Sequence, residues 1–210
     1  MILSLNEIET TMLKAARGAG MAWGLAEEAA QAARWLAVAG VGFEAAFLHV
    51  LEAAPWRTDI VFERATFRPR DPLASLCPIR VGACLSDLPD ILPLRVERVL
   101  QPLLLLPFAA RLDRPIAVTW NGVELRLPDR DMATQAGNAH SAFGGWAETV
   151  ELTGSDAAEM ASSAALPSAG GIDIDVARWL QLRAFEARTY VPATQRSRLL
   201  GAGAGAIDNQ

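Results

Sequence analysis

The chain has 210 residues, of which 51% are hydrophobic and 20% charged, and its formal net charge is −5. Intrinsic disorder needs low hydrophobicity and a high net charge, so this composition excludes a disordered chain, and the length suits a single domain over residues 1–210. The acidic balance argues against nucleic acid as a partner, because contacts to phosphates need a basic surface.

Residues 1–54 are predicted to form a helical N-terminal part. Ser4 and Glu7 have the Ser-x-x-Glu spacing of a capping box, which satisfies free backbone N–H groups at the start of a helix. Apolar residues then recur at steps of three and four, as on one face of a helix. Gly18 or Gly20 would end this helix, because glycine readily adopts the left-handed conformation found there.

Two further helices are predicted over residues 25–39 and 44–53. Alanines on the facing sides of the first two helices favour a tight antiparallel hairpin, because small side chains let the backbones approach. We expect Met12, Trp23 and Trp35 to fill the ends of this hairpin.

Residues 57–152 are predicted to be mainly β. Nine of the twelve prolines lie between Pro69 and Pro128, and proline disfavours long helices. Runs of β-branched and apolar residues between turn residues indicate strands. The predicted strands are residues 59–67, 79–85, 94–100, 116–120, 123–127 and 146–152.

The clearest β signal is a hairpin around Asn121 and Gly122. Asn-Gly supplies the positive φ angles that a type I′ turn needs, and both arms alternate apolar residues with polar or small ones. Its buried face would contain Ile116, Val118, Trp120, Val123, Leu125 and Leu127.

The C-terminal helical part, residues 172–189, is predicted to hold one more helix from about Val176 to Ala187, with Asp175 as its cap. Its apolar residues cover more than one face, so we expect it to be buried on several sides. Residues 190–210 form a glycine-rich tail. The fold class is therefore α+β: an N-terminal helical hairpin and a third helix packed on a mostly antiparallel sheet, with one C-terminal helix.

Both ends of the chain resemble an uncharacterised bacterial family. The opening residues Ser4-Leu5-Asn6-Glu7, Lys14 to Gly20 and Trp23 to Glu28 are similar to it, as is the closing segment from Tyr190 to Gly205. The family is described as a domain of unknown function, with members of this approximate length. The resemblance implies that essentially the whole chain belongs to one family domain and that the protein is bacterial. Because no catalytic residues are known for the family, the resemblance assigns none in this sequence.

Two segments combine arginine with glycine and are candidate sites for an anion, because guanidinium groups and glycine-exposed N–H groups suit carboxylates and phosphates. For the first segment, around Arg17, the alternative is a connection between two helices. For the second, around Arg196, the alternative is a frayed chain terminus. The candidate ligand-binding residues are Arg17, Gly18, Gly20, Arg196, Ser197, Arg198, Gly201 and Gly203. The two segments could converge, since chain termini often lie close together.

Catalytic candidates are weak. His140 and Ser141 lie on a predicted loop, where catalytic groups are common, but a Ser-His mechanism also needs an orienting acid. Cys77 and Cys84 have no metal-ligand spacing, so we expect no metal and no cofactor.

No segment is predicted to target the chain to a membrane. A signal peptide is not apparent at Met1, and the longest apolar run, Leu103–Leu106, is too short to span a bilayer. We therefore expect a cytoplasmic protein without a membrane partner. The first functional hypothesis is the binding of a small anionic metabolite, with or without catalysis. The alternative is a non-catalytic interaction or assembly subunit that forms a homodimer.

Overall fold

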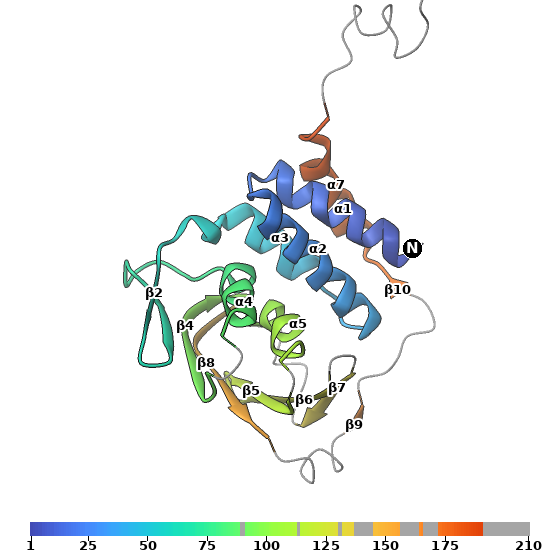
Figure 1. Cartoon of the computed structure of the whole chain (residues 1–210). Coiled ribbons are helices and arrows are strands. Elements are labelled where there is room, and N and C mark those ends of the chain that lie inside the picture. Colours follow the sequence, from blue (N-terminus) through green and yellow to red (C-terminus); the bar gives the residue numbers. More distant parts are fainter. Residues whose placement is uncertain are drawn as a thin grey trace, which may run out of the picture.

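The computed structural model describes residues 1–88, 91–112, 114–129, 132–136, 145–155, 164–165 and 172–190. In these residues, helices cover one face of an eight-stranded sheet, and a C-terminal helix returns to the N-terminal one (Figure 1). All strand pairs of this sheet are antiparallel except β3 with β4. The predicted α+β class, with N-terminal helices before a mostly antiparallel sheet and one C-terminal helix, is confirmed.

The three N-terminal helices lie where the sequence places them: α1 (Leu5–Gly18), α2 (Trp23–Val38) and α3 (Glu44–Ala53). The capping box is formed, because the Ser4 hydroxyl accepts a hydrogen bond from the Glu7 N–H at 3.2 Å and Glu7 Oε2 accepts one from the Ser4 N–H at 2.8 Å. Local signals therefore set the start of α1.

Alanines fill the interface between α1 and α2, as predicted, and Met12 is fully buried. Trp23 does not fill an end of this hairpin, because its side chain is 59% exposed. It lies in the first turn of α2, where its Nε1 donates to Glu27 at 2.6 Å and the Arg17 guanidinium lies 5.6 Å from its ring centre. These polar contacts at the helix start hold the ring at the surface.

The order of strands in the large sheet is β2-β3-β4-β8-β5-β6-β7-β9, and β1 pairs with β10 in a separate two-stranded sheet. The strands are β1 (Ile2–Leu3), β2 (Ile60–Glu63), β3 (Thr66–Pro69), β4 (Leu94–Leu100), β5 (Ile116–Trp120), β6 (Val123–Asp129), β7 (Met132–Ala136), β8 (Trp146–Gly154), β9 (Ala164–Ala165) and β10 (Ile172–Asp173).

The predicted hairpin is β5 with β6. Trp120 pairs with Val123, and the turn residues Asn121 and Gly122 have φ angles of 47° and 77°. The six apolar side chains predicted to share its buried face are all at most 5% exposed. The hairpin thus anchors the core side of the sheet.

Two strand predictions need correction. Residues 59–67 are not one strand, because Arg64 and Ala65 have positive φ angles and turn the chain from β2 into β3. Residues 79–85 belong to a helix, α4 (Pro78–Ser86). Proline is favoured in the first turn of a helix, and the buried residues of α4 recur at helical steps, so Pro78 starts a helix here.

A layer of short helices lies between the N-terminal helices and the sheet. It consists of α4, η2 (Pro102–Leu105) and α5 (Leu106–Ala109), which contact α2 and α3 on one side and β5 and β8 on the other. Gly82 permits this packing, since a Cβ atom there would lie 2.2 Å from the Phe108 ring. One further short helix, η1 (Pro55–Arg57), links α3 to β2.

The C-terminal helix, α7 (Val176–Ala187), is capped by Asp175 as predicted. It is not buried on several sides: Trp179 and Leu182 are buried, whereas Val176 is 49% and Leu180 is 59% exposed. The reason is that α1 and α3 cover one flank of α7, and the flank with Val176 and Leu180 faces outward.

Candidate functional site

A groove runs between α1 and α7, where the two ends of the described chain meet. The helices start side by side, because β1 and β10 pair through Ile2 and Asp173 just before them. They end side by side as well, since a Cβ atom at Gly18 would lie 1.9 Å from the Phe185 carbonyl oxygen. The hollow between them has a volume of about 290 Å³.

One wall of this groove is apolar. It is formed by Leu3, Val176, Trp179 and Leu180, and next to it Ile2 is 81% exposed. Apolar side chains gathered around a hollow on a protein surface mark a site for a ligand or a partner.

The far end of the groove is polar and centres on Glu186, which is 6% exposed. Its carboxylate accepts a hydrogen bond from the Tyr190 hydroxyl and forms ion pairs with Lys14 and Arg183, each at 3.5 Å. Lys14 Nζ also donates to the Tyr190 hydroxyl at 3.3 Å. The contact joins the single lysine of the chain to its single tyrosine.

Two cations face one carboxylate at this end. The hydrogen bond to the Tyr190 hydroxyl and the nearby Glu186 carboxylate raise the pKa of Lys14, and Lys14 is a cation at neutral pH. At the near end, hydrogen bonds from Ser4 lower the pKa of Glu7, whose carboxylate is occupied by the capping box. The cationic side chains therefore gather at the far end, where Arg183 lines the groove and Lys14 lies beside it on Glu186.

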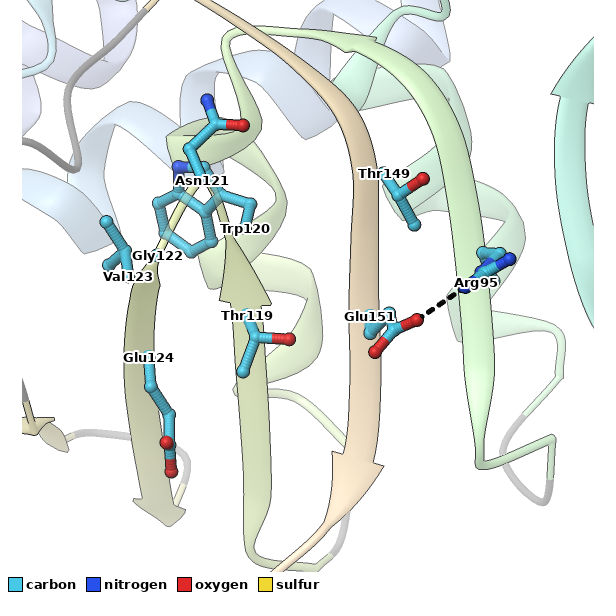
Figure 2. A pocket seen from close by; sticks show the side chains of 9 residues that line it. All are labelled: Arg95, Thr119, Trp120, Asn121, Gly122, Val123, Glu124, Thr149 and Glu151. Atoms are coloured by element: carbon cyan, nitrogen blue, oxygen red, sulfur yellow. Dashed lines mark hydrogen bonds and ion pairs between the residues drawn. The ribbon is translucent and has the colours of Figure 1, made fainter.

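A second candidate region lies on the open face of the large sheet (Figure 2). Arg95 on β4 and Glu151 on β8 form an ion pair at 2.8 Å, and hollows of about 410 and 390 Å³ flank this pair. Thr119 of β5 and Thr149 of β8 line the second hollow. The face is polar and open to water.

A third polar contact joins α3 to the end of β4. His49 is exposed, and its Nδ1 lies 2.8 Å from Nε2 of Gln101, which is 8% exposed and has a φ angle of 54°. Gly145 closes the contact: a Cβ atom there would lie 3.1 Å from that Nε2 atom. The arrangement fixes the imidazole ring, but His49 lines neither the groove nor the two hollows on the sheet.

The structure places the Arg17 segment at the start of α2. The Arg17 guanidinium donates to the Met21 carbonyl oxygen, and Gly20 has a φ angle of 99°. Gly18 faces the Phe185 backbone, so packing between α1 and α7 accounts for a glycine at this position. Arg17, Gly18 and Gly20 as ligand-binding residues stay a prediction.

The other candidate residues lie outside the described part of the chain. They are His140, Ser141, Arg196, Ser197, Arg198, Gly201 and Gly203. Within the described ranges, no group of three or more His, Cys, Asp and Glu side chains could hold a metal ion. None of the helices described combines the length and the apolar character needed to cross a membrane.

Sequence reasoning missed the residues that build both candidate regions. Lys14 and Tyr190 are 176 positions apart, and Arg95 and Glu151 are 56 apart. A local pattern cannot indicate such pairs. One signal did exist for the groove: the apolar residues of α7 cover more faces than one neighbouring layer can bury.

Residues 3–77 match a family model described as "Protein of unknown function (DUF3726)". No curated protein and no solved structure matches the chain. The resemblance to a family of unknown function is confirmed, but the match covers the helical N-terminal part and the β2–β3 hairpin rather than the whole chain. The match includes the part of the groove formed by Leu3 and α1, but it does not include α7.

Proposed function

We propose that the protein binds a small anionic metabolite with an apolar body in the groove between α1 and α7. The carrying observation is the division of this groove into an apolar wall and a cationic end. The anionic group lies against Arg183, with Lys14 close by on the other side of Glu186, and the apolar body covers Val176 and Leu180.

Two physical arguments support this assignment. Covering the exposed Val176 and Leu180 side chains removes apolar surface from water, which favours binding. Arginine donates hydrogen bonds to carboxylates and phosphates in a fixed geometry, and Glu186, held between Lys14 and Arg183, offsets one of their two charges. The groove therefore selects a single anionic group joined to an apolar one.

We assign no reaction to this site. The described residues that line the groove include no histidine, serine or cysteine, and the Glu186 carboxylate is already occupied by three partners.

The test is a titration of the full chain with hexanoate and with hexanamide, followed by amide chemical shifts. Hexanoate should shift the signals of Leu3, Thr11 and Leu180 in a saturable manner, and hexanamide should bind at least tenfold more weakly. Hexanamide carries no charge, so it loses one charge-assisted hydrogen bond of about 1.5–3 kcal/mol. This loss corresponds to a decrease in affinity of tenfold or more. The absence of saturable shifts at the groove would refute the proposal.

A pair of arginines on one helix provides matched variants. Arg183→Gln removes a cation that lines the groove, so hexanoate affinity should fall about tenfold or more. Arg178→Gln removes an exposed arginine that pairs with Asp175 on the same helix but does not line the groove, so affinity should stay unchanged. Arg17→Gln tests the alternative position: a loss of affinity in this variant alone would move the site to the start of α2.

The exposure of Ile2, Val176 and Leu180 also favours a second function, assembly as a homodimer. Glu7 and Arg183 line the same groove, Glu7 in the first turn of α1 and Arg183 beyond Leu180 on α7. A two-fold axis across the groove would bring each of these charges near its opposite, as a self-complementary interface requires. Sedimentation equilibrium of the parent and of Leu180→Glu distinguishes the functions: a dimer that Leu180→Glu dissociates supports assembly, and a monomer at micromolar concentration excludes it.

A bacterial origin and a cytoplasmic location stay predictions of the sequence. Expression of a tagged full-length chain followed by cell fractionation tests the location.

A further inference from the structure

Three residues in one row along α7 line the groove between α1 and α7. Val176, Leu180 and Arg183 follow one another at steps of four and three residues, and residues at these steps lie on the same face of a helix. Val176 and Leu180 are exposed apolar side chains, whereas Arg183 is the cation at the far end of the groove. The row is therefore an apolar track with one cation at its end.

The Arg183 guanidinium has donors left for a ligand. Its Nε lies 3.5 Å from Glu186 Oε2, and the described residues form no other ion pair with it. Lys14 and Tyr190 hold Glu186 in place, so this ion pair keeps Arg183 at the C-terminal end of the track, away from Val176. The two Nη groups can therefore donate to the two oxygens of one carboxylate.

The near end of the groove is unfavourable for a second anion. Glu7 lines it in the first turn of α1, and its carboxylate accepts hydrogen bonds from the Ser4 N–H and hydroxyl groups. These bonds lower the pKa of Glu7, so Glu7 is an anion at neutral pH. On α7 the track ends with Val176, because the residue before it is the charged cap Asp175. A ligand should therefore place its charge at the far end and an apolar group at the near end.

The helix sets the length of the track. Arg183 is seven residues beyond Val176, which corresponds to roughly 10 Å along the axis. An extended alkyl chain advances roughly 1.2 Å per bond, so the seven carbon–carbon bonds of octanoate span about 8 to 9 Å. With a hydrogen bond of about 3 Å at the carboxylate, the methyl end of octanoate reaches Val176. By the same estimate, butanoate ends near Leu180.

We propose that the groove takes an unbranched monocarboxylate of about eight carbons, with its carboxylate on Arg183 and its methyl end on Val176. This inference rests on the proposed function and adds the class, the length and the direction of the ligand. The carboxylate is free, because an ester or a thioester would bring no charge to Arg183.

A series of straight-chain carboxylates from butanoate to dodecanoate tests the length. Each is titrated into the full chain below its micelle-forming concentration, with calorimetry and amide chemical shifts as readouts. Affinity should rise about two- to fourfold with each methylene group up to octanoate, because each covers more apolar surface. From octanoate to dodecanoate it should rise less than twofold in total. Octanoate should shift the signals of Leu3 and Val176, and butanoate should not.

Octanedioate tests the direction. It has the length of octanoate but a carboxylate at each end, so its second charge would lie toward Glu7. It should bind at least tenfold more weakly than octanoate. Glu7→Gln should reduce this difference and keep α1 intact, because glutamine also completes a capping box.

Two valines provide matched variants for the apolar end. Val176 and Val38 are each 49% exposed and each lie at an end of a helix, but of the two only Val176 lines the groove. Val176→Thr should weaken octanoate about threefold and leave butanoate unchanged, because only octanoate reaches this position. Val38→Thr should change neither affinity.

The outcomes separate this inference from the proposed function. Hexanoate binding in the groove without any dependence on chain length would overturn the inference and leave the proposed function standing. The same holds for an affinity that keeps rising to dodecanoate, or for octanedioate that binds as tightly as octanoate. Absence of saturable shifts at the groove with every carboxylate would refute both. A melting curve for each variant confirms that it is folded, so a change in affinity is read only from folded protein.

Discussion

Replacing Gly18 with alanine tests the close approach of α1 and α7. A Cβ atom at this position would lie 1.9 Å from the Phe185 carbonyl oxygen and 2.8 Å from its carbon. Both are backbone atoms, so α7 must move as a unit. Overpacking of this kind costs about 1–3 kcal/mol, against which alanine regains up to about 1 kcal/mol of helix propensity. We expect a net destabilisation of roughly 1–2 kcal/mol.

Thermal unfolding followed by circular dichroism measures this effect. For a chain of this size, a loss of 1–2 kcal/mol lowers Tm by about 2–8 °C. Gly24→Ala is the matched control. Gly24 lies in the first turn of α2, close in sequence to Gly18, and nothing lies within 4 Å of a Cβ atom at Gly24. Its Tm should equal that of the parent or exceed it by up to about 4 °C, because helix propensity rises without a clash. A Gly18→Ala protein as stable as the parent would refute the packing role, and an unchanged Tm with lost anion binding would instead support the ligand-binding interpretation.

Three further changes have defined outcomes. Gly82→Ala places a Cβ atom 2.2 Å from the Phe108 ring and should destabilise by about 1–3 kcal/mol in urea unfolding; Phe108→Leu should recover part of this loss in the double variant. Glu44→Gln removes the charge from a buried carboxylate that accepts a hydrogen bond from the Asp175 N–H at 3.1 Å, so it should lose about 1–3 kcal/mol in the same assay. Burial raises the pKa of Cys77 from 9.0 to about 11. Between these values the unfolded thiol has lost a proton that the native thiol keeps, so stability is unaffected below pH 9 and falls as the pH rises toward 11. Urea midpoints measured at pH 8 and pH 10.5 should show this fall, and Cys77→Ala should reduce it.

Elements with a complete local signal could be predicted from the sequence. The capping box of Ser4 and Glu7 fixes the start of α1, and Asn121-Gly122 fixes the β5–β6 hairpin, because in each case neighbouring residues form the deciding contacts. The helix α4 was missed for the opposite reason. Its nine residues lie among prolines, and an apolar segment that short has no clear period.

The candidate regions depend on tertiary arrangement and could not be predicted. Arg95 meets Glu151 only because β8 inserts between β4 and β5, and Lys14 meets Tyr190 only because α7 packs along α1. The expected convergence of the Arg17 segment with the segment from Arg196 to Gly203 stays a prediction, because the second segment lies outside the described residues. What the structure does show is that α1 and α7 are in contact. This contact brings Arg183 and Glu186 into the groove and Lys14 beside it, and the sequence interpretation assigned none of the three to a site.

Two forces would hold a ligand in the groove, and their dependence on salt separates them experimentally. Much of the driving force comes from covering Val176 and Leu180, and apolar burial depends little on salt. Arg183 acts on a charge near the surface, and ions screen such interactions within about 8 Å at physiological ionic strength. Raising the salt concentration from 50 to 500 mM should therefore weaken hexanoate only in part, since hexanoate keeps its apolar contacts. A complete loss of hexanoate binding at 500 mM salt would mean that the exposed wall of α7 contributes little to binding, and the homodimer would then be the better explanation for its exposure.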